Sequence, residues 1–216
     1  MRNVARDAPS RTERAALCDL LLEVGPDAPT LCEGWTTLDL TAHLLVRERK
    51  PTAGPGIVLG GPLGKITERA MARVSAGASF EELVARLRAG PPFWWWAADR
   101  FVNTIEFFVH HEDVRRGGGD IAPRPERGIS NVESSLWQLT PRIAPLLTRS
   151  LGPTGLELSS PGHGTVRARR GSPSAVVTGR PGEIVLYLYG RKDAASVGIG
   201  GPPEAVEALR SARFGL

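Results

Sequence analysis

A carboxylate and an imidazole stand four residues apart in one of the most apolar stretches of the chain. The segment NTIEFFVHHEDVRR, residues 103–116, carries Glu106 and His110 among phenylalanine, isoleucine and valine residues. A spacing of four places two side chains on the same face of an α-helix, one turn apart. Asn103 and Asp113 fall on that face as well, so the four residues form a polar stripe on a helix that is otherwise apolar.

Glu106 needs a partner if this helix is buried, as a helix that is apolar around most of its circumference normally is. An unpaired carboxylate in a protein interior costs several kcal/mol or more. Three compensations are open: an arginine pairs with Glu106, the carboxyl group stays protonated, or a metal ion binds Glu106 and His110 together. The last is the arrangement by which zinc-binding helices present two ligands from one face.

A metal would need a third ligand, and the chain has four histidines. His43 lies on the apolar face of another expected helix, which it shares with Arg47. His111 points about 100° away from His110 on the same helix, and His163 lies in a turn rich in proline and glycine. We therefore predict a divalent-metal site made of His43, Glu106 and His110.

Two imidazoles and one carboxylate leave coordination positions open, which is typical of a catalytic metal site. Zn²⁺ suits this ligand set best, and Ni²⁺, Fe²⁺ and Mn²⁺ are compatible with it. The loop at residues 51–64, rich in glycine and proline, directly follows the helix that carries His43. We expect this loop to help cover the pocket.

Helical periodicity predicts that helices position these residues. Apolar residues recur at helical spacing, and pairs of Ser or Thr with Asp or Glu three residues later mark three helix starts. The expected helices are residues 11–24, the segment that starts at Thr36, residues 65–76, the segment that starts at Ser79, residues 92–116 and the segment that starts at Ser130. The capping pairs are Thr36 with Asp39, Ser79 with Glu82 and Ser130 with Glu133. Pro141 and Pro145 are expected to kink or end the last helix.

After residue 151 the pattern changes to short β-like runs. The segments LELSS, TVRAR, SAVVTG and SVGIG read as strands, and PPEAVEALRSAR reads as a terminal helix that starts at a proline. EIVLYLYGR is ambiguous between strand and helix by pattern alone. We therefore expect an α+β chain with a helical domain over residues 1–150 and a small α/β domain over residues 151–216.

Composition narrows the classes of partner. The chain has 216 residues and a formal net charge of +4, and its arginines are interleaved with acidic residues. No recognisable nucleic-acid reading element accompanies this charge, so we expect no nucleic-acid partner. Neither a membrane-spanning run nor a secretory signal is visible, so we expect no membrane partner and a cytoplasmic location. Cys18 and Cys32 form no C-x-x-C motif, and we expect reduced, partly buried thiols rather than metal ligands.

Two stretches closely resemble a known family. GPDAPTLCEGWTTLDLTAHLLVRE and EFFVHHEDVRR are similar to the DinB-like metal-binding bundles of the mycothiol-dependent maleylpyruvate isomerase superfamily, and more narrowly to an actinobacterial metal-binding branch of it. The resemblance covers nearly the whole chain and includes the order of its motifs. It implies a DinB-like four-helix bundle followed by a small C-terminal α/β domain, in which EIVLYLYGR is helical.

The resemblance also implies roles for individual residues. His43, Glu106 and His110 would hold a divalent metal, Asp113 would orient a ligand or a neighbouring arginine, and Arg191 from the C-terminal domain would be an active-site arginine. It implies mycothiol as a thiol cofactor, which the metal would activate for addition to a small electrophilic substrate.

We therefore expect a thiol-dependent transferase or isomerase-like enzyme, either a monomer or a homodimer. The alternative is a non-catalytic metal-binding module with a structural or sensing role. DNA binding is a distant third hypothesis, and a steep loss of affinity with salt would be needed to revive it.

Overall fold

The fold is described by a computed structural model for residues 8–49, 61–90 and 100–215. Over these residues the chain is α+β, as predicted, with helices followed by a small four-stranded sheet near the C-terminus. The contacts divide the chain into two compact units, residues 1–120 and 121–216. This division falls before α7 (Ser130–Leu147), whereas the predicted boundary at residue 150 falls after that helix.

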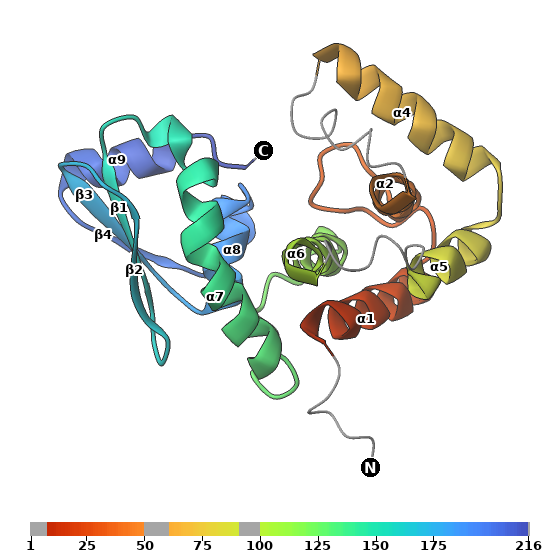
Figure 1. The fold of residues 1–216 in the computed structure, drawn as a ribbon, viewed down its shortest axis with the longest axis horizontal. Helices are drawn as coiled ribbons and strands as arrows, with labels where there is room; N and C mark the ends of the chain where they lie inside the picture. The colour runs from red at the N-terminus through yellow and green to blue at the C-terminus, as the bar shows by residue number, and fades with distance from the viewer. Residues whose placement is uncertain (1–7, 50–60, 91–99, 216) are drawn as a thin grey trace. The chain divides into compact units, whose positions relative to one another are not determined.

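The first unit is helical. Its α6 packs against α1, and α2 packs against α4 and α5, while α1 also contacts α5. Figure 1 shows α6 beside α1 and α2. The bounds are α1 Pro9–Val24, α2 Thr37–Arg49, α4 Gly61–Ala76, α5 Phe80–Ala89 and α6 Arg100–Gly117. Residues 92–99 of the helix predicted over 92–116 lie outside the described residues. Fully buried side chains from four of these helices form the core: Leu17, Leu21, Leu40, Leu44, Leu83, Leu87 and Phe107.

Capping pairs start two of these helices, as predicted. The backbone N–H and the hydroxyl of Thr36 donate to Asp39 Oδ2 at 3.0 and 2.9 Å. Ser79 and Glu82 form a reciprocal capping box at the start of α5. Both motifs satisfy backbone N–H groups that have no partner within the helix.

The third predicted capping pair is wrong. No side-chain hydrogen bond caps α7 at its start, and Glu133 accepts instead from Arg180 Nε at 3.0 Å. Arg180, which is distant in sequence, thus binds the carboxylate that the local pattern assigns to the helix cap. The helix also continues through Pro141 and Pro145 to Leu147, so neither proline ends it.

The second unit is a mixed sheet packed against helices. Its strand order is β2-β1-β3-β4, with β1 and β3 parallel and the two outer pairs antiparallel. The strands are β1 Gly155–Ser160, β2 Gly164–Arg169, β3 Ser174–Thr178 and β4 Gly198–Gly200, and the further helices are α8 Pro181–Leu188 and α9 Pro203–Ser211. Alternate residues of β1 and β3 share one core with α7, α8 and α9, and Figure 1 shows α7 and α8 beside the sheet.

The segment EIVLYLYGR is helical over its first six residues, Glu183 to Leu188, as the family resemblance implies, and its last three residues lie beyond the helix. It contributes most of α8, and all eight residues of that helix are buried. Burial on every side explains why the segment shows neither helical nor strand periodicity. None of the described helices combines the length and apolarity that a bilayer-spanning helix needs.

A buried ion pair ties α1 to α2. Arg14 Nη1 donates to Glu48 Oε2 at 2.9 Å and to the Leu87 carbonyl oxygen at 2.8 Å, and Arg14 Nη2 also pairs with Glu48. The guanidinium lies 4.2 Å from the centre of the Phe107 ring. Because the Glu48 side chain is only 1% exposed, Arg14 supplies the opposite charge that a buried carboxylate needs.

We expect Arg14→Met to lower the free energy of unfolding by about 3–5 kcal/mol, because it leaves Glu48 buried without its cation. Arg88→Met is the control, since Arg88 pairs with Asp19 at 2.7 Å but the two side chains are 40% and 73% exposed. Its loss should stay within about 1 kcal/mol. Urea denaturation followed by circular dichroism measures both changes, and equal losses would contradict the argument.

Candidate metal centre

The structure brings the three predicted metal ligands together at the contact between α2 and α6. His43 comes from α2, and Glu106 and His110 come from successive turns of α6. Glu106 Oε1 lies 3.2 Å from His110 Nε2 and 3.7 Å from His43 Nε2. The rings of His43 and His110 meet edge to face with their centroids 5.4 Å apart. Helix geometry explains the pair on α6, and helix packing brings in the residue from α2.

The spacing of these atoms fits a metal ion. Ligand atoms about 2.0–2.2 Å from a tetrahedral zinc ion are about 3.3–3.6 Å from one another. The two separations from Glu106 Oε1, 3.2 and 3.7 Å, lie within about 0.1 Å of that range. All three ligand atoms lie within 4.8 Å of one another. Two of the three separations therefore match a tetrahedral ion, and the third lies within 4.8 Å.

Asp113 stands behind His110, on the side of the ring away from Glu106. Its Oδ2 atom lies 2.9 Å from His110 Nδ1, and the Asp113 side chain is fully buried. A carboxylate that accepts the Nδ1 proton fixes the tautomer in which Nε2 has a free lone pair for a metal. This geometry is compatible with the orienting role that the family resemblance implies for Asp113, and that role stays a prediction.

An arginine also reaches Glu106. Arg47, one turn after His43 on α2, places Nε 3.3 Å from Glu106 Oε1, and its Nη1 donates to Asn103 Oδ1 at 2.7 Å. One of the three compensations considered for Glu106, an ion pair with arginine, is therefore present. A carboxylate has about four lone-pair positions, so Arg47 and a metal ion can both bind Glu106. Arg47 would nevertheless repel and compete with the ion.

The surroundings shift the pKa values of the two histidines in opposite directions, down for His43 and up for His110. Burial lowers the pKa of His43 although Glu106 lies beside it, so its imidazole is neutral. Burial opposes the charge on Glu106, but the hydrogen bond from His110, the nearby His43 ring and the charge of Arg47 outweigh it and hold the pKa well below its usual value. Burial also opposes a charge on His110, yet hydrogen bonds with Asp113, Cys32 and Glu106 raise its pKa well above the usual value. Without a metal ion, this shift favours the imidazolium form of His110, which lies between the carboxylates of Glu106 and Asp113.

The other histidines lie elsewhere. His111 faces α1, where its Nδ1 atom is 3.4 Å from Glu13 Oε2. His163 belongs to the second unit, with its ring 6.2 Å from that of Trp137.

Two further predictions concern residues away from the cluster. Arg191 belongs to the second unit, where its Nη1 donates to the Tyr189 carbonyl oxygen at 2.7 Å. Its role as an active-site arginine stays a prediction. Residues 51–60 of the loop predicted to cover the pocket lie outside the described residues, and residues 61–64 begin α4.

Sequence reasoning missed one residue of the site. Cys32, expected to be a thiol without a ligand role, donates from Sγ to Asp113 Oδ2 at 3.3 Å. With His110 and Asp113 it forms a second group of possible ligand atoms within 4.8 Å of one another. The signal that points to it is the motif Leu-Cys-Glu-Gly-Trp, which places a cysteine in the turn directly before the helix of His43.

No family model matches the chain, and neither a curated protein nor a solved structure matches it. The resemblance to DinB-like proteins therefore stays a prediction from the motifs. The cluster between α2 and α6 has the geometry and chemistry from which a function can be proposed.

Proposed function

We propose that the chain binds one divalent metal ion through His43, Glu106 and His110, and that the ion activates a small thiol for reaction with a small electrophilic molecule. The observation that carries the proposal is the convergence of three ligand atoms from two helices at the spacing of a metal coordination shell. Three protein ligands leave at least one coordination position for a substrate, which favours a catalytic site over a structural one. Zinc is the expected ion.

The fold and the thiol are the parts of the proposal that come from the family resemblance. The helical unit would be a DinB-like bundle, and the thiol would be mycothiol. When bound, the ion supplies a Lewis acid that lowers the pKa of a coordinated thiol. The open position in the ligand set is compatible with such a thiol.

The residues of the chain have distinct tasks in this proposal. His43, kept neutral by burial, offers a lone pair without first losing a proton. Asp113 accepts from His110 Nδ1 and so directs Nε2 toward Glu106. Arg47, held by Asn103, adds a positive charge beside the site, which favours an anionic substrate.

Metal content tests the binding step. Elemental analysis of the full chain, stripped with a chelator and reloaded with Mn²⁺, should find about one Mn²⁺ per chain, and Glu106→Gln should lose it because an amide carries no charge to hold the ion. His111→Gln, on the same helix but facing Glu13, should keep the ion. Metal content that is unchanged in Glu106→Gln would remove Glu106 from the site.

Thiol binding tests the catalytic part separately. Mycothiol titrated into the metal-loaded chain should bind, whereas the metal-free chain and Glu106→Gln should bind at least tenfold more weakly, or about 1.4 kcal/mol. Calorimetry measures all three. Binding of equal strength with and without the metal would contradict thiol activation and leave the non-catalytic metal-binding module as the better description.

Metal affinity should rise with pH. Because the pKa of His110 is raised well above its usual value, the metal-free chain carries a proton on this residue at neutral pH, and the ion must displace it from Nε2. Below that raised pKa, each unit of pH should change the apparent affinity up to about tenfold, with tighter binding at the higher pH. Titrations at about pH 6 and about pH 8 with Mn²⁺, which stays soluble over this range, measure the effect. Equal affinities would show that no proton is displaced.

A further inference from the structure

The turn that carries Cys32 is held against the last turns of α6. The Leu31 N–H donates to the Asp113 carbonyl oxygen at 3.0 Å. The approach is possible because Gly117 has no side chain: a Cβ atom there would lie 2.4 Å from the Pro29 carbonyl oxygen. The Thr30 hydroxyl closes the turn by donating to the Trp35 carbonyl oxygen at 2.9 Å. The backbone thus fixes the position of the thiol over α6.

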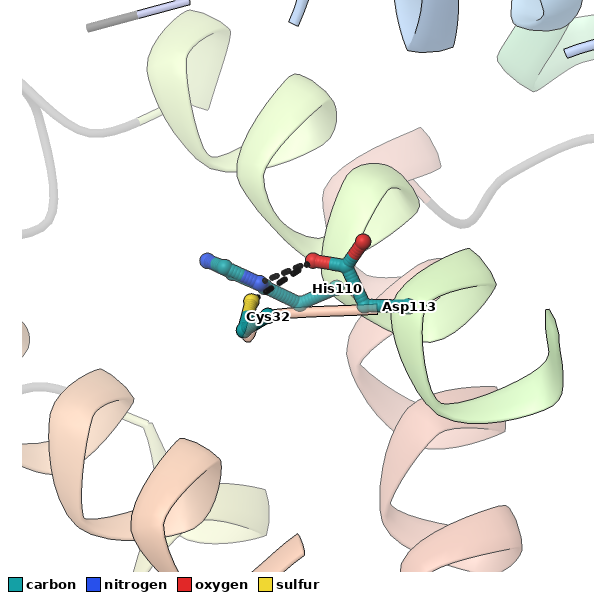
Figure 2. Close-up of side chains that lie close together, drawn as sticks. All are labelled: Cys32, His110 and Asp113. Carbon is teal, nitrogen blue, oxygen red and sulfur yellow. Dashed lines mark hydrogen bonds and ion pairs between the residues drawn. The ribbon is translucent and has the colours of Figure 1, made fainter. Parts of the chain in front are cut away.

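Three different ligand types meet at this point. Figure 2 shows the Cys32 sulfur, the Nδ1 side of the His110 ring and one carboxylate oxygen of Asp113 directed at one another. Asp113 Oδ2 lies 3.3 Å from Cys32 Sγ and 2.9 Å from His110 Nδ1. Asp113 is fully buried and His110 is 8% exposed, while Cys32 is half-buried. An ion could therefore reach the group from the side of the thiol.

We propose that Cys32, His110 and Asp113 form a second metal site, which takes a thiophilic divalent cation such as Cd²⁺ or Zn²⁺. A thiolate selects soft cations, whereas the nitrogen and oxygen ligands of the first site also suit harder ones. Around a zinc-sized ion the Asp113 oxygen would lie about 3.6 Å from the sulfur and about 3.3 Å from the nitrogen. The present distances are a few tenths of an ångström shorter, so a small opening of the group admits the ion.

The protons and charges balance on binding. The ion displaces the Cys32 thiol proton and the Nδ1 proton of His110, and both leave to solvent. The Nε2 proton stays and faces Glu106 Oε1, 3.2 Å away. Thiolate and carboxylate then carry two negative charges against the two positive charges of the cation. Binding at the first site uses the opposite tautomer of His110, in which Nδ1 keeps its proton. The second site therefore shares His110 with the proposed function, but it needs neither His43 nor Glu106.

Cadmium titration of the full chain tests this site. A bound thiolate gives a charge-transfer absorption band in the ultraviolet, and Cd²⁺ should produce this band in the wild type with one thiolate per chain. Cys32→Ser should lose the band and bind Cd²⁺ at least tenfold more weakly. Cys18→Ser is the matched control and should keep the band, because Cys18 is fully buried, donates to the Val84 carbonyl oxygen and has a pKa raised to about 11 by burial. Circular dichroism confirms that each variant is folded.

Glu106→Gln separates this proposal from the proposed function. It should lose Mn²⁺ binding at the first site and keep the cadmium–thiolate band. A variant that keeps Mn²⁺ would overturn the first site and leave the second unaffected. Absence of the band in the wild type, its survival in Cys32→Ser, or its loss in Glu106→Gln would each overturn the independent second site.

Discussion

His110→Ala should lower the affinity for divalent metal by about a thousandfold or more, which exceeds the ~10–100-fold typical of losing a residue that only orients a ligand. The reason is geometric: Nε2 faces Glu106 Oε1 at 3.2 Å and Nδ1 faces Asp113 Oδ2 at 2.9 Å, so both candidate ligand groups lose an atom at once. Titration with Mn²⁺ and with Cd²⁺ measures the two losses separately. The Mn²⁺ loss reports the first site, and the Cd²⁺ loss reports the second.

His111→Ala is the matched control for this prediction. His111 has the same chemistry and the next position on α6, but its ring faces Glu13 of α1. It should leave metal affinity within about threefold of the wild type, because it contributes no ligand atom. Asp113→Asn should fall between the two variants, at about 10–100-fold weaker Mn²⁺ binding. Equal losses in His110→Ala and His111→Ala would mean that the substitutions act through folding and not through coordination.

Arg47→Met should have the opposite effect and tighten metal binding. The guanidinium holds Glu106 Oε1 from 3.3 Å and places a positive charge next to the proposed ion. At an effective dielectric constant of about 20, a unit charge and a divalent ion about 5 Å apart repel by about 7 kcal/mol. The Arg47 side chain is 17% exposed, so solvent screens part of this repulsion. We expect a gain in affinity of about ten- to a hundredfold, measured by Mn²⁺ titration.

Arg115→Met controls for the general loss of one positive charge on the same unit. The Arg115 side chain is 16% exposed and pairs with Glu112 at 2.7 Å, so its burial and its partner resemble those of Arg47. Its substitution should change Mn²⁺ affinity by less than about threefold, because Glu112 and Asp120, with which Arg115 pairs, offset its charge. Weaker metal binding in Arg47→Met, with a large loss of stability, would instead mean that the arginine is the true partner of Glu106.

The sequence predicts the part of the site that lies on one helix. Glu106, His110 and Asp113 share a face because of their spacing, and helix geometry is enough to place them together. His43 stands out among the four histidines because it lies on the apolar face of another expected helix. Local pattern also predicts the strands of the second unit and the capping pairs at the starts of α2 and α5.

The sequence does not predict the side-chain contacts that join segments distant from one another in the chain. The Arg47 contact with Glu106 depends on how α2 crosses α6, and Cys32 reaches Asp113 only because a backbone hydrogen bond and Gly117 bring its turn close. Glu133 matches the capping pattern, but Arg180, 47 residues later in the chain, takes its carboxylate. None of these pairings leaves a periodic signal in the sequence.

A metal ion seen directly at the three ligand atoms is the decisive observation for the account. Crystals of the full chain grown with Zn²⁺, with diffraction measured above and below the zinc absorption edge, give an anomalous map that locates the ion. We predict a peak about 2.0–2.2 Å from His43 Nε2, His110 Nε2 and a carboxylate oxygen of Glu106. A map without a peak there, in which the Arg47 guanidinium binds both oxygens of Glu106, would contradict it.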